Sequence, residues 1–409
     1  MKAVVSLNSG SSSIKFALFT VDEQGLPTLS AGGKIEKIGI APHLEARSAD
    51  GVALLERDWA DGAALTHADL LRDLFAWASD HLDDHEVIAV GHRVVHGGTE
   101  FAAPRLVDAA LIDKLDALCP LAPLHQPHNL AAIRAIAELR PDLPQVACFD
   151  TAFHHDMPAV ASRFALPRTF HEQGIRRYGF HGLSYEYIAR RLAEIDPVLA
   201  SGRVIAAHLG NGASLCAMRA GKSVDTTMGF TTLDGLMMGS RSGSLDPGVV
   251  LHLQMQLGMS AAEVEELLYK KSGLLGVSGL SSDMRTLSQS GAPEAEEAIE
   301  LFCWRAAREA GGLIASLGGL DAIVFTAGIG ENHADVRSRI CRRLAWLGVE
   351  IDELANAGDG PRITVPDSPV AALVIPTDEE RMIALHALDA AKRITGTVMP
   401  VGGAQHLLA

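Results

Sequence analysis

The segment Asn8-Ser-Gly-Ser-Ser-Ser-Ile-Lys15 carries residue types that suit the binding of a phosphate group. It follows a short apolar run at residues 4–7, and residues 15–19 then alternate like the second strand of a hairpin. Small residues let backbone N–H groups approach an anion closely, Ser hydroxyls add donors, and Lys15 adds a reachable positive charge. The segment therefore predicts a phosphate loop between two strands, with a flexible polar hairpin turn as the alternative.

Two further glycine-rich turns stand at the ends of apolar runs. His208-Leu-Gly-Asn-Gly212 lies between expected strands at 204–207 and 214–218, which repeats the strand, turn and strand seen around residue 8. Ala327-Gly-Ile-Gly-Glu-Asn332 follows an expected strand at 322–326 and precedes an expected helix from about 333 to 347. Free N–H groups at such a helix N-terminus suit a nucleotide. Three such turns indicate a nucleotide enzyme with two related phosphate-clamping domains.

Other nucleotide motifs fail on spacing. Neither Gly210-Asn-Gly212 nor Gly328-Ile-Gly330 completes G-x-G-x-x-G, so the dinucleotide fingerprint is absent. Ala220-Gly-Lys-Ser223 resembles the end of a Walker A loop, but the upstream glycine that this loop requires is Cys216.

Charged side chains among small residues supply the candidate chemistry. Arg93 follows an apolar run at 87–90, and Arg241 lies within Met238-Gly-Ser-Arg-Ser-Gly243. Two such arginines suit a planar phosphoryl group or a carboxylate, with an ordinary surface ion pair as the alternative. His181 is flanked by tight backbone in Arg177-Tyr-Gly-Phe-His-Gly182, where a core histidine bonded to a carbonyl is the alternative.

Asn8, Asp150 and Glu379 offer oxygen atoms from the ends of different elements. Mg²⁺ takes such ligands one or two at a time while it keeps its waters and grips phosphates. For Glu379 the alternative is a charge that favours the start of a helix. The histidine-rich spots lack H-E-x-x-H or a recognisable third ligand, which argues against zinc: His92 with His96, His125 with His128, and His154-His155-Asp156.

Length and composition bound the class of protein. The 409 residues suggest two or three domains, and alternating strands and helices predict an α/β fold. A net charge of −15 argues against nucleic acid or an anionic membrane as a partner. The 5 cysteines are odd in number and form no C-x-x-C pair, which favours a reduced cytoplasmic protein. We see no apolar run long enough to span a bilayer, and polar residues come too early for a secretory signal.

Two helices are also predicted from the sequence. A capping box at 66–69 predicts a helix through Leu82, and a last helix near 378–393 is expected to return to the first domain.

Nearly the whole chain resembles the acetate kinase family, of the acetate and sugar kinase, heat-shock ATPase and actin superfamily. The resemblance rests on the first loop and on a series of motifs in order: Gly91-His-Arg-Val-Val-His-Gly-Gly98, Ala122-Pro-Leu-His125, Phe149-Asp-Thr-Ala-Phe-His154, Arg177-Tyr-Gly-Phe-His-Gly182, His208-Leu-Gly-Asn-Gly212, Asp234-Gly-Leu-Met-Met-Gly239, Gly276-Val-Ser-Gly279, Ser281-Ser-Asp-Met-Arg285, Thr326-Ala-Gly-Ile-Gly-Glu-Asn332 and Thr377-Asp-Glu-Glu380.

The resemblance implies two duplicated actin-like ATPase domains with the active site in the cleft between them. The first would span 1–150 plus 385–409, with the closing C-terminal helix, and the second 151–384. It implies reversible, Mg²⁺-dependent transfer of the γ-phosphoryl of ATP to acetate, giving acetyl phosphate and ADP, with Mn²⁺ able to substitute. It also implies a cytoplasmic homodimer that serves acetyl-CoA biosynthesis, with small molecules as its other partners.

The resemblance assigns roles residue by residue. Asn8 and Glu379 would be metal ligands, with Glu380 the other candidate and Asp150 near the metal and substrate. Arg93, His181 and Arg241 would surround the phosphoryl, together with Asp150 as the catalytic set. Val95, Leu124, Phe180 and Thr232, with Arg93, would line the substrate site. The nucleotide would meet Lys15, His208, Leu209, Gly210, Asn211, Gly212, Asp283, Met284, Arg285, Gly330, Glu331, Asn332, His333 and Ala334.

The chain departs from the family's usual sequence near the acyl pocket. Thr231-Thr-Leu-Asp234 stands where the family has Thr-Pro-Leu-Glu, and Gly239-Ser-Arg-Ser-Gly-Ser244 where it has Gly-Thr-Arg-Ser-Gly-Asp. Leu124-His-Gln-Pro-His128 departs from the usual His-Asn-Pro-Pro. The alternatives are therefore a propionate or broad short-chain carboxylate kinase. A non-catalytic ATP-driven binding module would not need Arg93 and Arg241, and a metallohydrolase is the third possibility.

A carboxylate acceptor determines what the enzyme must supply. By analogy with Glu, whose pKa is about 4.3, acetate is already ionised at pH 7 and needs no base. Magnesium, two arginines and a histidine can bring two anions together and stabilise the moving phosphoryl group. We expect direct in-line transfer, with domain closure excluding water.

Overall fold

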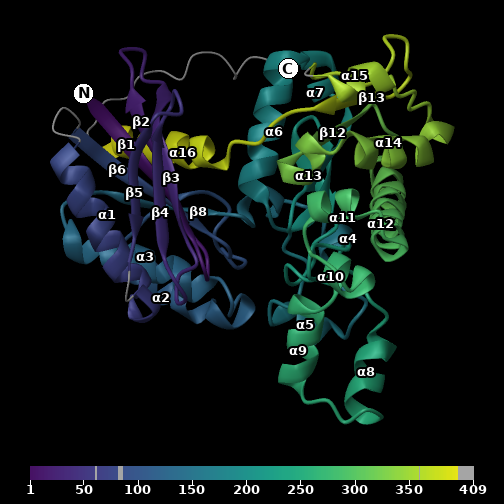
Figure 1. Ribbon diagram of the computed structural model, residues 1–409, viewed down its shortest axis with the longest axis horizontal. Helices are drawn as coiled ribbons and strands as arrows, with labels where there is room; N and C mark the ends of the chain where they lie inside the picture. The colour runs from purple at the N-terminus through teal and green to yellow at the C-terminus, as the bar shows by residue number, and fades with distance from the viewer. Residues whose placement is uncertain (60–61, 82–85, 359, 395–409) are drawn as a thin grey trace. The chain divides into compact units, whose positions relative to one another are not determined.

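The computed structural model describes residues 1–59, 62–81, 86–358 and 360–394. The chain forms two compact units. Among the described residues, unit 1 comprises those within 1–97, 103–149 and 379–394, and unit 2 comprises those within 98–102 and 150–378. Each unit holds one mixed sheet with helices against it, so the fold is α/β as predicted (Figure 1).

Unit 1 contains an eight-stranded sheet in the order β5-β4-β3-β2-β1-β6-β8-β7. Strands β1 to β5 form an antiparallel meander, whereas β6 and β8 continue from β1 in parallel. The strands are β1 (Lys2–Ser9), β2 (Ile14–Val21), β3 (Pro27–Glu36), β4 (His43–Ser48), β5 (Ala53–Asp58), β6 (Glu86–Val94), β7 (Arg105–Leu106) and β8 (Gln145–Phe149). The helices are α1 (His67–His81), α2 (Ala109–Ala117), α3 (Gln126–Leu139) and α16 (Glu379–Ile394), with 3₁₀ turns at Gly62–Ala64 and Cys119–Leu121. The predicted helix position Leu82 lies outside the described residues.

The core of unit 1 lies between the sheet and helices α1 and α3. Leu7 and Ile14 from the sheet pack with Leu71 of α1 and Ile136 of α3. Helix α16 covers the other face at Gly91, where an added Cβ would lie 2.4 Å from the Ile383 side chain and 2.9 Å from its carbonyl. Only glycine allows this close approach, which fixes where α16 begins relative to the strand ends.

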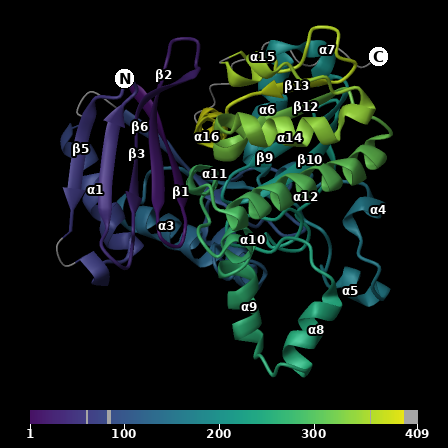
Figure 2. The same cartoon turned by 45° about the vertical axis from the view of Figure 1, so that its right-hand side comes forward.

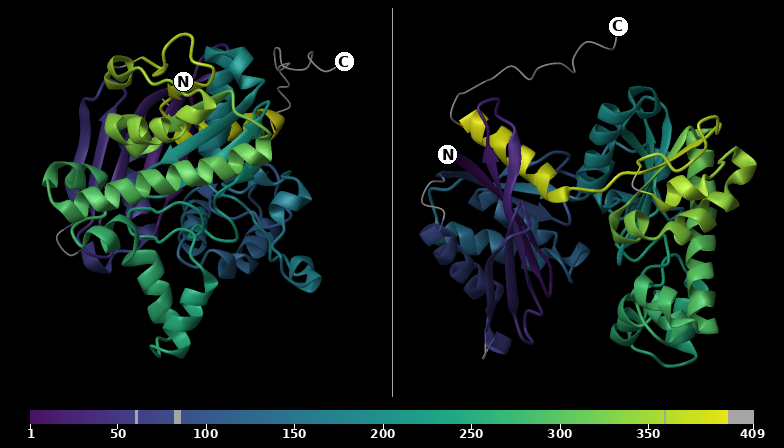
Figure 3. Two further views of the ribbon diagram at one scale, coloured as in Figure 1. Left: turned by 90° about the vertical axis from the view of Figure 1, so that its right-hand side faces the viewer. Right: turned by 45° about the horizontal axis from the view of Figure 1, so that its top comes forward.

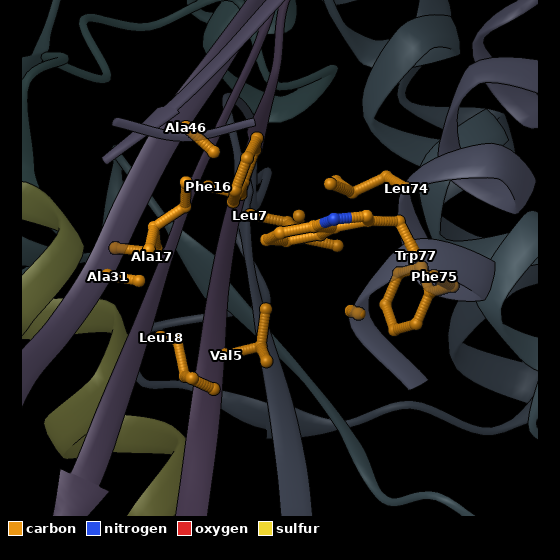
Figure 4. Close-up of a pocket in the computed structure, with 12 residues that line it drawn as sticks. Val5, Leu7, Phe16, Ala17, Leu18, Ala31, Ala46, Leu74, Phe75 and Trp77 are labelled. Atoms are coloured by element: carbon orange, nitrogen blue, oxygen red, sulfur yellow. The ribbon is translucent and has the colours of Figure 1, made fainter. Parts of the chain in front are cut away.

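A pocket opens beside α1 on the core side of the sheet (Figure 4). Its lining is apolar throughout: Val5, Leu7, Phe16, Ala17, Leu18, Ala31, Ala46, Leu54, Leu74, Phe75, Trp77 and Ala78. Ligand sites add a few convergent polar groups to such a lining, and these residues offer none except the Trp77 indole N–H. The pocket is therefore an incompletely filled part of the core.

Unit 2 contains a five-stranded sheet in the order β11-β10-β9-β12-β13. These strands are β9 (Arg203–Leu209), β10 (Ala213–Arg219), β11 (Lys222–Thr226), β12 (Ala322–Thr326) and β13 (Ala371–Val374). Strands β9 to β11 are antiparallel, and β9, β12 and β13 are parallel. The same order and directions occur in unit 1 for β3-β2-β1-β6-β8, so the repeat predicted from the two Gly turns extends to the sheet topology.

Helices surround the sheet of unit 2. Tyr185, Ile188 and Leu192 of α6 pack on one face of it, and α12 lies on the opposite side (Figure 1). Figure 3 shows the length of α12 against this unit, and Figure 2 shows α8 and α9 projecting from it as a hairpin. The helices are α4 (Ala159–Ser162), α5 (Arg168–Glu172), α6 (Gly182–Ile195), α7 (Pro197–Ala200), α8 (Pro247–Met255), α9 (Ala261–Lys270), α10 (Gly273–Ser278), α11 (Met284–Ser290), α12 (Pro293–Leu317), α13 (Ala327–Asn332), α14 (Ala334–Arg343) and α15 (Glu353–Ala357), with 3₁₀ turns at Ala152–His154 and Ala345–Leu347.

One sequence prediction in unit 2 is wrong. Residues 327–332 were expected to be a loop before a helix starting at 333, but they form helix α13 directly after β12. The Glu331 side chain accepts from the backbone N of Ala327 at 2.7 Å, so the helix supplies a cap for its own N-terminus. The glycines at 328 and 330 made the segment look like a loop in the sequence. Glycine lowers helical propensity but does not prevent the helical conformation. No helix in the described part of the chain combines the length and apolarity needed to cross a membrane.

Candidate functional site

Three predicted site residues from distant parts of the chain meet in unit 1. Arg93 Nη1 donates to Asn8 Oδ1 at 3.2 Å, and Arg93 Nε lies 3.9 Å from Glu379 Oε2. Asn8 and Arg93 are near the carboxyl ends of the adjacent parallel strands β1 and β6, and Glu379 is the first residue of α16. The ends of parallel strands and the helix packed across them share one edge of the sheet, which is why positions 8, 93 and 379 converge.

Glu379, rather than Glu380, contacts this cluster. Both residues stand in the first turn of α16, where negative charge is favoured by the helix dipole. Only the Glu379 carboxylate has an ion pair with Arg93 among the described contacts, and its side chain is only 14% exposed. The two residues that the sequence could not separate therefore differ in their surroundings.

The predicted phosphate loop is a tight turn held from its backbone. Asn8 and Lys15 are direct cross-strand partners in the β1–β2 hairpin, so their side chains share one face. Within the turn, Gly10 N donates to Ser13 O at 2.8 Å. His67 Nε2 donates to Gly10 O at 2.7 Å, and Asn129 Nδ2 donates to Ser9 O at 2.6 Å. The loop is fixed in place by helices α1 and α3.

Asn129 also connects the loop to the predicted acyl wall. Its Oδ1 accepts from the backbone N of Val95 at 3.0 Å, while its Nδ2 holds Ser9. Sequence reasoning missed Asn129. The only feature that could have drawn attention to it is its position directly after residues 124–128, which depart from the usual family sequence. In that stretch Gln126 is buried and exchanges hydrogen bonds with both backbone groups of His96, at 3.1 and 3.0 Å. The departure from the family at Gln126 therefore has a structural role.

In unit 2, His181 and Arg241 flank the second glycine turn. A Cβ added to Gly212 would lie 3.4 Å from His181 Nε2 and 3.8 Å from Arg241 Nη1. Arg241 Nη1 donates to Thr232 O at 3.0 Å, and Gly239 N donates to Asn211 O at 3.1 Å. A Cβ at Gly212 would therefore be in van der Waals contact with both His181 and Arg241. The structure thus brings two predicted catalytic residues beside the predicted phosphate turn.

His181 has an unusual backbone. It is the N-cap of α6 with φ of +58°, in the left-handed region that side-chain-bearing residues rarely adopt. The next residue, Gly182, donates its N–H to Asp150 O at 2.9 Å, and a Cβ there would lie 2.1 Å from that oxygen. Asp150, which follows β8 and is 1% exposed, is therefore packed against the start of α6. Backbone strain of this kind concentrates at functional sites.

The rings of His181 and His208 stack, with centroids 4.2 Å apart and planes 18° apart. His208 lies at the end of β9, before the turn that the sequence assigned to phosphates. Its Nδ1 is 2.9 Å from Ser184 Oγ, and His181 Nδ1 is 2.8 Å from Ser214 Oγ. Sequence reasoning missed both serines, because nothing in their spacing shows that they lie behind histidines.

The two segments predicted to frame adenosine approach each other. Asp283 is the N-cap of α11, and its bond from Thr286 N lowers the pKa of its carboxyl below the usual value. Burial lowers the pKa of His333, which also feels the charges of Asp283 and Arg285. Met284 is buried. These relations place residues 283–285 within electrostatic reach of His333.

The backbone of α13 has further support. Buried Arg337 donates to Gly330 O at 2.9 Å and to Glu331 O at 2.8 Å. The Glu331 carboxylate accepts from Thr377 N at 3.1 Å in addition to Ala327 N. Glu331 therefore has a clear structural function, and Arg337 is a second residue that sequence reasoning missed.

The acyl-wall residues are divided between the units. Val95 and Leu124 belong to unit 1, and Phe180 and Thr232 belong to unit 2. Val95 and Phe180 are buried, whereas Leu124 and Thr232 are half-buried. Within the described residues no group of three or more His, Cys, Asp and Glu side chains could hold a metal. Any metal at Asn8 and Glu379 would thus rest on few protein ligands, as Mg²⁺ sites do.

Two sheets of one topology, each with a Gly-rich turn between its first two strands, define the duplicated actin-like ATPase class of protein. Residues 3–385 match the model of the acetokinase family, and the chain belongs to that family. It is 56% identical over 387 residues to an acetate kinase of Rhodopseudomonas palustris (strain ATCC BAA-98 / CGA009), covering 93% of this chain and 96% of the relative.

Two solved structures are similar along nearly their whole length. A propionate kinase from Francisella tularensis subsp. tularensis SCHU S4 superimposes with a TM-score of 0.88 at 38% identity, covering 95% of this chain and 100% of the other. An acetate kinase from Porphyromonas gingivalis gives a TM-score of 0.85 at 38% identity, covering 95% and 99%.

Proposed function

We propose that this protein is a carboxylate kinase that transfers the γ-phosphoryl of ATP reversibly to acetate, giving acetyl phosphate and ADP. The convergence of Asn8, Arg93 and Glu379 carries the proposal, because it joins an amide oxygen, a carboxylate and a guanidinium at the predicted phosphate loop. The names of the relatives support the same activity. Nothing in this set suits a hydrolase that needs a metal cluster.

The oxygen donors fit a magnesium ion. Asn8 Oδ1 lies 3.2 Å from Arg93 Nη1 and Glu379 Oε2 lies 3.9 Å from Arg93 Nε, so two hard oxygen donors contact one guanidinium. We assign Asn8 and Glu379 as the protein ligands, with Asp150 near the metal. A bound Mg²⁺, or Mn²⁺ in its place, would be held by these two residues and would neutralise charge on the phosphates of ATP.

The remaining groups position the reactants and stabilise charge. Lys15 and residues 208–212 would hold phosphates through a side-chain charge and backbone N–H groups, and residues 283–285 with 330–334 would frame adenosine. Arg93 and Arg241 would bind the anionic oxygens of the phosphoryl and the acceptor, and His181 would donate to the phosphoryl in flight.

No general base is required in this reaction. The acceptor is already a carboxylate at neutral pH, so the attacking oxygen needs no proton removed. Asp150 would therefore act by its position and charge. Direct in-line attack of the carboxylate on the γ-phosphorus breaks the bond to the bridging oxygen, and ADP leaves with that electron pair.

Propionate is the second candidate acceptor. Thr232 stands where the family usually has proline, and its carbonyl is held by Arg241, so the residue adjoins the proposed catalytic arginine. A pocket difference of one methylene is worth about 1–3 kcal/mol in discrimination. The similar solved propionate kinase also favours testing this acid.

The decisive experiment measures ATP-dependent acyl hydroxamate formation with formate, acetate, propionate and butyrate. The proposal predicts the highest kcat/KM with acetate and a Mg²⁺ requirement. Hydrolysis of ATP without hydroxamate from any acid would overturn it. Thr232→Pro should change the propionate-to-acetate ratio of kcat/KM, and an unchanged ratio would show that this residue does not contact the acyl chain.

We also propose a cytoplasmic homodimer that pairs through the hairpin of α8 and α9. Helix α8 is mostly apolar apart from His252 and Gln254, yet none of its residues is buried within the chain. Large apolar side chains are exposed on α8 and just beside it: Leu245, Val249, Leu251, Met255 and Leu257. A patch of this kind is typical of a protein interface, and a stable dimer needs roughly 800 Å² per partner.

A further inference from the structure

Two buried hydroxyl groups lie behind His181 and form a hydrogen-bonded chain with its ring. His181 Nδ1 contacts Ser214 Oγ at 2.8 Å, and Ser214 Oγ makes a short hydrogen bond with the Tyr185 hydroxyl. Tyr185 and Ser214 are each 0% exposed. Tyr185 lies one helical turn beyond His181 in α6, where its N–H donates to His181 O at 3.1 Å, and Ser214 comes from β10. The hydroxyl groups therefore have no access to bulk water as a partner.

The chemistry of the three groups sets the direction of the protons. A phenol has a pKa near 10, far below that of an alkyl alcohol, so it is the stronger donor and the poorer acceptor of the pair. Tyr185 therefore donates to Ser214. Ser214 Oγ has two acceptor lone pairs and one proton, and directing that proton to His181 Nδ1 makes this nitrogen the acceptor. In this arrangement the proton on the imidazole ring resides on Nε2.

The stack with His208 disfavours a positive charge on both rings at once. The two rings lie face to face with centroids 4.2 Å apart, and two imidazolium charges at that separation would repel each other. His208 Nδ1 has its own serine partner, Ser184, whose Oγ lies 2.8 Å from Thr377 Oγ1. Both rings are thus fixed at Nδ1 and present Nε2 away from their serines.

His181 Nε2 faces the second glycine turn. A Cβ built at Gly212 would lie 3.4 Å from His181 Nε2 and 3.8 Å from Arg241 Nη1. A neutral Nε2–H at this place is a preorganised hydrogen-bond donor for an anionic oxygen.

We propose that Tyr185 and Ser214 are positioning residues that fix His181 as a neutral imidazole, with its proton on Nε2 and that N–H aimed at the transferring phosphoryl. This inference rests on the proposed role of His181 in the transfer. Both residues are fully buried, so they would act through the orientation and tautomer of one ring. Wrong tautomers of active-site histidines are costly even where the geometry survives.

The first test is a ¹⁵N–¹H correlation spectrum of the histidine rings in the ligand-free protein, with His181→Gln identifying the His181 signals. The expected spectrum has a protonated Nε2 and an unprotonated Nδ1 in the wild type. Tyr185→Phe, which deletes one oxygen atom, should produce a mixture of tautomers. Tyr178→Phe is the matched control, because it removes another buried tyrosine hydroxyl of unit 2, one that donates to Gly174 O at 2.6 Å. It should leave the His181 signals unchanged.

The second test is kinetic. Ser214→Ala should lower kcat by about tenfold or more while KM for ATP and acetate changes far less, as expected when a supporting hydrogen bond is removed. Ser214→Thr keeps the hydroxyl and should recover most of kcat. A wild type with protonated Nδ1, or a Tyr185→Phe spectrum identical to the wild type, would overturn the relay. If the spectra behave as expected but kcat does not fall, the relay stands and the proposed role of His181 in the transfer is wrong.

Discussion

Ser244 Oγ donates to Asp234 Oδ1 at 2.7 Å, so two positions that depart from the usual family sequence contact each other. Asp234 also accepts from Gly235 N at 2.8 Å, and its Oδ2 pairs with Arg177 at 3.0 Å. Asp234 and Ser244 therefore form one hydrogen-bonded unit that closes the loop of residues 234–244, which contains Arg241.

We expect Ser244→Asp to destabilise the protein by about 1–3 kcal/mol, because it replaces a donor with a second carboxylate beside Asp234. The like charge raises the pKa of one carboxyl in the folded state. The penalty is therefore greatest above that raised pKa and fades as the pH falls toward the unfolded value. Thermal unfolding from pH 4 to 8 measures it, with Ser244→Asn, which keeps a donor, as the control. A deficit that does not vary with pH would contradict the charge argument.

Arg93→Ala and Arg241→Ala should each lower kcat by roughly 10³–10⁵-fold while the affinity for ATP changes little, as for arginines that stabilise phosphoryl transfer. Arg93→Lys and Arg241→Lys should recover little, because lysine lacks the planar fork. Steady-state kinetics and equilibrium nucleotide binding separate the two effects. Lysine variants with near-wild-type kcat would show that charge alone matters.

Asn8→Ala and Glu379→Ala should raise the Mg²⁺ concentration needed for half-maximal activity, since each removes one oxygen ligand. Glu380→Ala is the matched control, because it removes a neighbouring carboxylate of the same helix turn that has no described contact with Arg93. Magnesium titrations of the three variants give the comparison. A shift for Glu380→Ala in place of Glu379→Ala would move the ligand by one residue.

Asp150→Asn should lower kcat and weaken the response to Mg²⁺ together, because it keeps the shape of a buried residue and removes its charge. The pH dependence of kcat in the direction of acyl phosphate formation is the measurement. No basic group should be required, since acetate is ionised throughout the neutral range. Asp150 would be identified as a base by two results together. The wild-type kcat would depend on a pKa that disappears in Asp150→Asn, and the Mg²⁺ affinity of the variant would be unchanged.

Met255→Glu and Leu251→Glu should convert the proposed dimer to a monomer, because each places a charge in the apolar patch on α8. Met255 is 72% exposed, so the folded chain itself should tolerate the change. Leu354→Glu on α15, at an 88% exposed leucine, is the control. Analytical ultracentrifugation reads out the mass. A wild-type monomer, or dimers that survive both changes on α8, would refute this interface.

Much of this protein follows from sequence pattern, because the relevant signals are local. The predicted phosphate loop at 8–15 and the turn at 208–212 are adjacent along the chain to the strands that flank them, so the turns themselves can be recognised in the sequence. The repeat of strand, turn and strand likewise needed only spacing. The same local reasoning failed at 327–332, where Glu331 caps α13 through a contact that glycine-rich sequence does not reveal.

The tertiary structure decided which distant residues meet. Glu379 and Glu380 are equivalent in sequence, and only the packing of α16 at Gly91 turns Glu379 toward Arg93. Asn129, Arg337 and Ser214 support the site through hydrogen bonds that span 120, 7 and 33 residues. A side chain's partner across a sheet depends on register and on the path of the whole backbone. Sequence alone therefore predicted the candidate reactive groups, whereas the fold determined which side chains orient them.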